Sequence, residues 1–203
     1  IGGSEFDPKD IKQNMKKFIA RAYRRPPTHE QIQSLHQIYT DRKSKGIDAW
    51  QAYKDSLKAA LCSPNFIYLQ EPVVPKSNQL DSFAIASRLS YFLWSSLPDW
   101  QLFDLANNEK LEDPTILSLQ VERMLKDPKS NRFVKGFLDA WLTLDNLGNT
   151  PPDPNRFSEY YIDDLATAMR EETHIFLRHI LDNNLPTSEF LTAEYSFMNP
   201  ALA

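Results

Sequence analysis

One apolar stretch limits the fold of this chain more than any other feature of its sequence. Residues 86–99, ASRLSYFLWSSLPD, form an apolar run that holds a single arginine and ends in a polar turn. At helical spacing, Ala84 and Phe92 flank Arg88 on one face. We therefore expect a helix that places Arg88 in or beside a hydrophobic core. A buried charge without a partner is strongly destabilising, so a carboxylate from another helix should pair with it.

Three carboxylates are candidates for the partner of Arg88. Glu171 is the first choice, because it lies in a charged cluster that would face Arg88 if the two helices pack antiparallel. Asp139 and Asp99 are the alternatives. We expect an Arg88–Glu171 ion pair that fixes the register of two helices rather than one that performs chemistry.

Prolines and glycines indicate the fold class. The 203 residues include 14 prolines and only 5 glycines, so few tight β-hairpins are expected. Asp–Pro pairs at 7–8, 113–114 and 127–128 each place an N-cap acceptor before a proline preset for the first helical position. The pattern predicts an all-α fold, with a small N-terminal helical unit followed by a larger orthogonal or antiparallel helical bundle.

The same signals divide the chain into segments. Residues 1–7 are interpreted as a cloning scar, 8–70 as an N-terminal three-helix unit, 71–79 as a linker and 80–203 as a C-terminal helical bundle domain. The expected helices span 8–25, 29–45, 48–62, 80–96, 98–107, 114–126, 129–144 and 158–183. We expect the sequence to be a piece of a longer protein.

Charge and hydropathy narrow the classes of partner. The formal net charge is −4 and no basic stripe stands out, which argues against a nucleic-acid partner. The longest apolar run, around Tyr91–Trp94, is far shorter than the roughly 20 residues of a membrane helix. Cys62 is the only cysteine, so this chain by itself cannot form an internal disulfide, a CxxCH haem attachment or a cysteine zinc cluster.

Specific motifs occur along nearly the whole chain after residue 7. They lie at 18–26, 57–66, 86–99, 124–128, 169–176 and 195–199. Together these motifs resemble paired helical domains of unknown function from large planctomycete proteins that also carry a planctomycete-type cytochrome c domain.

The resemblance carries several expectations about context. It implies an exported, extracytoplasmic protein in which haem is held by a separate domain, with no cofactor in this chain. The implied partners are neighbouring domains of the same polypeptide, with redox proteins or a polysaccharide as further candidates. We expect a noncatalytic accessory or interaction module of that larger protein, with no membrane insertion.

Two residues support an alternative from a different class, a metal-binding enzyme fragment. Glu171 and His174 form a Glu-x-x-His pair on adjacent turns of one helical face, the spacing used in carboxylate-bridged di-iron bundles. Such a site needs a second copy of the motif, which the chain lacks. A charged helix face is therefore the preferred interpretation, and His29 and His36, seven residues apart, are interpreted in the same way.

Aromatic residues suggest a further alternative, a polysaccharide-binding module. Trp94, Trp100 and Trp141, with Tyr160 and Tyr161, would form a carbohydrate platform if they were exposed together. Aromatic residues at helical spacing more often lie in a core. We therefore expect these side chains to be largely buried.

Overall fold

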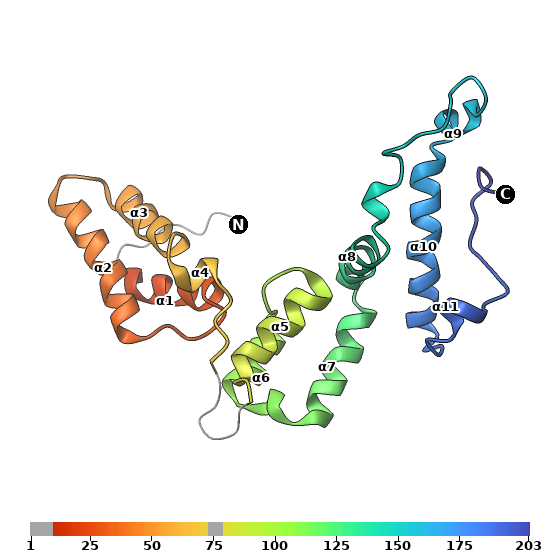
Figure 1. The fold of residues 1–203 in the computed structure, drawn as a ribbon. Coiled ribbons are helices and arrows are strands. Elements are labelled where there is room, and N and C mark those ends of the chain that lie inside the picture. The colour runs from red at the N-terminus through yellow and green to blue at the C-terminus, as the bar shows by residue number, and fades with distance from the viewer. Residues whose placement is uncertain (1–9, 73–78) are drawn as a thin grey trace. The chain divides into compact units, whose positions relative to one another are not determined.

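The computed structural model describes residues 10–72 and 79–203, and the helices and 3₁₀ turns within them confirm the all-α prediction (Figure 1). The expected cloning scar and most of the expected linker lie outside these residues. The chain forms two compact units. One holds the chain up to Tyr91 together with Ser96–Leu117, and the other holds Phe92–Ser95 and Ser118–Ala203.

The first unit begins with helices that enclose a common core. They are α1 (Ile11–Ala22), α2 (His29–Ser44), α3 (Ala49–Leu61) and the short α4 (Pro64–Ile67). Met15 and Ile19 of α1 are fully buried against residues of α2 and α3 such as Tyr53. Helix α2 starts with a capping box, in which Thr28 and Gln31 satisfy each other's backbone N–H groups. The apolar periodicity of the sequence and its capping residues explain why these helices begin and end within a few residues of the positions expected.

A buried arginine holds the end of α4 in this unit. Arg24 is 5% exposed and has φ 60°, a left-handed conformation that a non-glycine residue adopts at some cost. Its guanidinium donates hydrogen bonds to the carbonyl oxygens of Asn65, Phe66 and Tyr68 at 2.8–3.1 Å. The charge is buried without a carboxylate because several backbone acceptors take its donors.

Three further elements follow. They are α5 (Ser82–Trp94), α6 (Trp100–Asn107) and the 3₁₀ turn η2 (Lys110–Glu112). Asp99 caps α6 by accepting the backbone N–H of Leu102 at 2.9 Å. Asp99 therefore has a local role and is not the partner of Arg88.

The remaining helices lie in the second unit, except that residues 114–117 at the start of the first of them belong to the first unit. They are α7 (Pro114–Lys126), η3 (Pro128–Ser130), α8 (Asn131–Trp141), η4 (Leu144–Asn146), α9 (Ser158–Ile162), α10 (Leu165–Asp182) and α11 (Glu189–Thr192). The helix expected over 158–183 is interrupted, since Asp164 takes φ 48° and separates α9 from α10. Every helix of the described ranges is too short or too polar to cross a lipid bilayer.

Candidate functional site

Helices α8 and α10 form the framework of the second unit. Val134 and Leu138, one turn apart on α8, are 2% and 1% exposed and share a core with Leu177 of α10. This packing turns one face of α8 toward α10. The remaining surface of α8 carries large aromatic side chains, described below.

A pocket of about 400 Å³ opens between α8 and α10. Its lining consists of Asn131, Val134, Lys135, Glu171, His174, Ile175 and Arg178. His174 is 8% exposed, and its Nε2 lies 2.8 Å from Oδ1 of Asp139 on α8. When Nε2 carries the proton, His174 donates to Asp139. Asp139 thereby orients the imidazole, and it is not the partner of Arg88.

The pocket brings the two candidate metal ligands together but does not complete a metal site. Glu171 and His174 line the same pocket, as their spacing on one helix face predicts. Within the described residues, no group of three or more His, Cys, Asp or Glu side chains is placed to hold a metal ion. The other two histidines considered from the sequence lie on α2, where His29 is exposed and His36 is half-buried beside Tyr39.

Arg88 lies in a different environment from the one expected. Its side chain is 59% exposed and forms a two-pronged ion pair with Glu71, with Nη2 2.7 Å from Oε2. The hydrogen bond from Arg88 lowers the pKa of Glu71. The prediction of a buried Arg88 is therefore wrong, and its partner is Glu71 in place of Glu171.

Two small, buried residues of α5 explain why Arg88 was wrongly predicted to be buried. The buried face of α5 includes Ser87 and Ser90, which are 6% and 0% exposed. The hydroxyl of Ser90 donates to the carbonyl oxygen of Ser96 at 2.7 Å, so its burial leaves no unsatisfied donor. Because serine is polar, hydrophobicity alone predicts that these two serines are exposed, and it therefore gives the wrong orientation for the helix.

The three candidate tryptophans do not form a common platform. Trp94 is 1% exposed, and its indole N–H donates to the carbonyl oxygen of Met124 at 3.0 Å. Trp100 is 65% exposed in the first unit, with the guanidinium of Arg21 4.7 Å from its ring. Trp141, in the second unit, is 54% exposed. Among the tryptophans the expectation of burial thus holds for Trp94 alone, while Tyr160 is half-buried and Tyr161 is 46% exposed.

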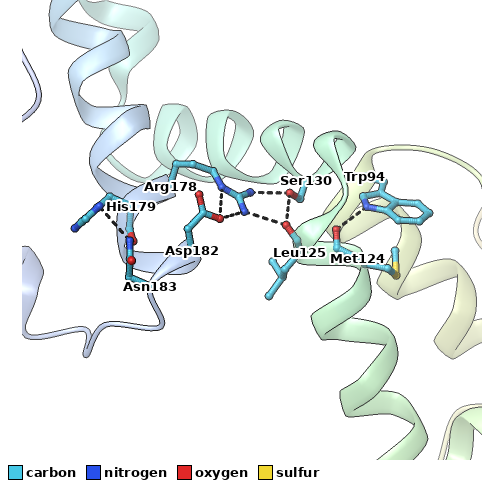
Figure 2. Close-up of polar contacts among 8 residues, drawn as sticks. All are labelled: Trp94, Met124, Leu125, Ser130, Arg178, His179, Asp182 and Asn183. Carbon is cyan, nitrogen blue, oxygen red and sulfur yellow. Dashed lines mark hydrogen bonds and ion pairs between the residues drawn. The ribbon is translucent and has the colours of Figure 1, made fainter.

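Arg178 connects α10 to the junction between α7 and α8, as Figure 2 shows. Its guanidinium donates to the carbonyl oxygen of Leu125 at 3.0 Å, to Oγ of Ser130 at 2.7 Å and to Asp182. Ser130 is fully buried and in turn donates to Leu125. This junction was not predicted from the sequence. The i,i+4 spacing of Arg178 and Asp182 indicates their ion pair, but it does not indicate the contacts of Arg178 with Leu125 and Ser130.

A row of aromatic side chains lies on α8 and beside it. Phe133, Phe137 and Trp141 follow one another at four-residue spacing, with ring centroids 5.6 and 5.4 Å apart. Phe92, at the end of α5, extends the row, with its ring 4.9 Å from that of Phe133. Phe92, Phe137 and Trp141 are 62%, 41% and 54% exposed. We call these four residues the aromatic stripe.

Two family models match the chain. Residues 80–203 match PSD4, "Protein of unknown function (DUF1592)", and residues 10–71 match PSD5, "Protein of unknown function (DUF1595)". No curated protein and no solved structure matches. The two matches confirm paired domains of unknown function. Helix α6 falls within the range of the first match, yet it belongs to the first compact unit.

Proposed function

This chain belongs to the PSD4 family of proteins of unknown function (DUF1592), and we propose that it is a noncatalytic interaction module of a larger, exported protein that also carries a cytochrome c domain. The resemblance of its motifs to paired planctomycete domains supports the exported, cytochrome-associated context. The surface of the second unit supports the role in interaction.

The aromatic stripe is the observation that carries this proposal. Large contiguous apolar patches are uncommon on the surface of monomeric proteins and mark sites of interaction. Phe and Trp are enriched in the buried centres of protein interfaces, where burial of each large side chain contributes about 1.5–3 kcal/mol. Phe137 and Trp141 still have half or nearly half of their surface available for such burial.

Neighbouring domains of the same polypeptide are the partners that fit best. A tethered domain is present at an effective concentration of about 1 mM, so a small apolar surface is enough to dock it. The partner would cover the aromatic stripe, while Val134 and Leu138 remain committed to the core on the other face of α8.

Cross-linking of the full-length polypeptide tests the proposal. Lys135 is exposed on α8, the helix that carries most of the stripe, and although it lies on another face, the arm of an amine-directed cross-linker can reach from it to a domain docked on the stripe. We expect amine-directed cross-links, identified by mass spectrometry, between Lys135 and a domain outside the present sequence. The double substitution Phe137→Ser and Trp141→Ser should remove them.

Leu191→Ser is the matched control, because Leu191 is 92% exposed in the same unit but outside the stripe. Its cross-links should equal those of the natural protein. Cross-links from Lys135 that persist in the double variant, or that reach only residues of this chain, would contradict the proposal. Fractionation of the source cells with an antibody to this chain tests export, and recovery in the cytoplasmic fraction would contradict that part.

A further inference from the structure

Three cationic side chains surround one tryptophan at the start of the aromatic stripe. The guanidinium carbon of Arg123 lies 5.4 Å and the ammonium nitrogen of Lys129 4.6 Å from the ring centroid of Trp94. Arg132 donates from Nη1 to the carbonyl oxygen of Trp94 at 2.9 Å. Arg123 also donates from Nε to Oε1 of Gln120 at 2.8 Å, so we call Lys129 and Arg132 alone the cationic cluster.

Trp94 is a fixed support for this cluster. It is buried, and its hydrogen bond to Met124 holds the indole in place (Figure 2). Attraction of a cation to an aromatic face contributes about 0.5–2 kcal/mol, which offsets part of the repulsion between the gathered charges. The cluster is therefore a permanent feature of the surface rather than a chance approach of mobile side chains.

The local charge differs in sign from the charge of the whole chain. The segment 123–135 contains one carboxylate, Asp127, which caps η3 by accepting the backbone N–H of Lys129 at 2.8 Å. Its cationic residues are Arg123, Lys126, Lys129, Arg132 and Lys135. The formal net charge of the chain is −4. Lys126, Lys129 and Arg132 are exposed, and positive charge of this kind attracts acidic partners and speeds their association.

The cationic cluster adjoins the aromatic stripe. Two contacts between α5 and α8 join them: Arg132 donates to the carbonyl oxygen of Trp94, and the rings of Phe92 and Phe133 lie 4.9 Å apart. From Phe133 the stripe continues along α8 to Trp141, a distance of about 12 Å at the rise of an α-helix. Positive charge thus lies near the end of α8 where the stripe begins, and the rings continue along about two helical turns.

We propose that this surface binds an acidic amphipathic segment of a neighbouring polypeptide, with its apolar side chains on the aromatic stripe and its carboxylates at the cationic cluster. The proposal rests on the proposed interaction role and adds the chemistry of the partner. Apolar anchors at helical spacing are a recurring mode of peptide recognition, and α8 presents its rings at that spacing.

The tilt of the rings favours a polypeptide over a polysaccharide. Successive rings of the stripe are inclined to one another by 51°, 27° and 36°. Sugar rings in a chain stack best on a flat row of coplanar aromatic faces, which this arrangement does not provide.

Selection from a displayed random peptide library tests the proposal without knowledge of the natural partner. The 203-residue chain serves as the target, and the selected peptides are compared with the input library. We expect enrichment of acidic peptides with apolar residues three or four positions apart. Selected peptides with the net charge of the input library, or a selection that enriches nothing, would overturn the proposal.

A charge-reversal pair then locates the binding site. In the double variant Lys129→Glu and Arg132→Glu, the affinity for a selected peptide should fall at least tenfold. The control Lys16→Glu and Lys17→Glu reverses two exposed charges on α1 and should leave the affinity unchanged. An equal loss in both variants would contradict the assignment of the site.

Salt titration of the natural protein avoids any effect of substitution on folding. Peptide affinity should fall with rising salt, because exposed charges are screened beyond about 10 Å at 0.1 M. A salt-independent affinity would overturn the role of the cationic cluster. Sulfated oligosaccharide is tested in parallel, and if it binds while no acidic peptide does, the occupant is a glycan and the proposal is wrong.

The cross-linking experiment separates this inference from the proposed function. If charge reversal leaves both peptide binding and the cross-links from Lys135 intact, while the stripe variant loses the cross-links, the interaction role stands and the acidic partner is wrong. If neither variant changes the cross-links, the proposed function itself fails.

Discussion

The helices at the start of the chain and the pair α8 and α10 use their aromatic residues in opposite ways. In the first region, α1, α2 and α3 pack on one another and bury Tyr23 and Tyr53 to 6% and 8% exposure. In the second, the described core around Leu138 leaves Phe137 and Trp141 exposed. The same kind of residue is thus buried in the core of one region and left exposed on the surface of the other.

The difference follows from how many helices share each core. A helix that packs between two others needs apolar residues over much of its circumference, and α1 meets this need with residues such as Met15 and Ile19. The buried side of α8 against α10 includes Val134 and Leu138, and Phe133 is partly buried against the same core, whereas Phe137 and Trp141 remain exposed. Their exposure is the reason for proposing that this part of the surface binds a partner.

The largest expected effect comes from breaking the closed core. Ile19→Ala should reduce the free energy of unfolding of the first unit by about 3 kcal/mol, because Ile19 is fully buried and its loss leaves a cavity. Urea denaturation followed by circular dichroism measures the change. Phe137→Ser is the contrasting variant, and it should change stability by less than about 1 kcal/mol. Equal losses would mean that the stripe is structural.

Removal of Arg178 should have the next largest effect. Arg178→Ala removes the hydrogen bonds that Arg178 donates to the buried Ser130 and to the carbonyl oxygen of Leu125, which keeps only the bond from Ser130, at a cost of about 2 kcal/mol. The second unit should melt at lower temperature by calorimetry. Arg88→Ala serves as the control, since its exposed ion pair with Glu71 should leave the melting temperature unchanged. A larger loss for Arg88 would reverse this ranking.

The paired residues of the pocket should respond differently to truncation. His174→Ala leaves Asp139 without its partner and should cost about 1–2 kcal/mol, whereas Glu171→Ala should be close to neutral. Elemental analysis of both variants and the natural chain, each purified without chelator or histidine tag, tests the metal alternative. We expect no stoichiometric metal in any of them. Metal that disappears in both variants would favour a metal-binding enzyme fragment instead.

The smallest effect should be a dependence on pH at Asp182. The hydrogen bond from Arg178 lowers the pKa of Asp182 from its ordinary value of 3.8. A lowered pKa in the folded state means that the stabilisation is complete above the unfolded value and is lost as the pH falls through the folded one.

Comparison with Asp182→Asn isolates this effect. At neutral pH the free energy of unfolding of the natural protein should exceed that of the variant by less than about 1 kcal/mol, since the carboxylate is half-exposed. Calorimetry from pH 7 to pH 3 should show the difference closing as the acid protonates. A difference that grows toward low pH would contradict the assigned sign.

Local sequence signals correctly indicated the helices and several of their ends. The caps of α2 at Thr28 and of α6 at Asp99, and the apolar face of α1, are formed by residues within a few positions of one another, so the expected ranges of these helices lie close to the observed ones. The co-location of Glu171 and His174 was predictable for the same reason, since both lie on one face of α10. The family resemblance likewise depends on contiguous motifs.

Long-range partners were decided only by the tertiary structure. Arg88 binds Glu71 rather than Glu171, and Trp94 gathers cations from two later segments, because such contacts depend on how helices are placed in space. The exposure of Trp141 and the burial of Ser90 could not be read from residue type, since each depends on which neighbour covers that face. Sequence determined the helices by local hydrogen bonding and periodicity, whereas packing determined which of their side chains remain available for a partner.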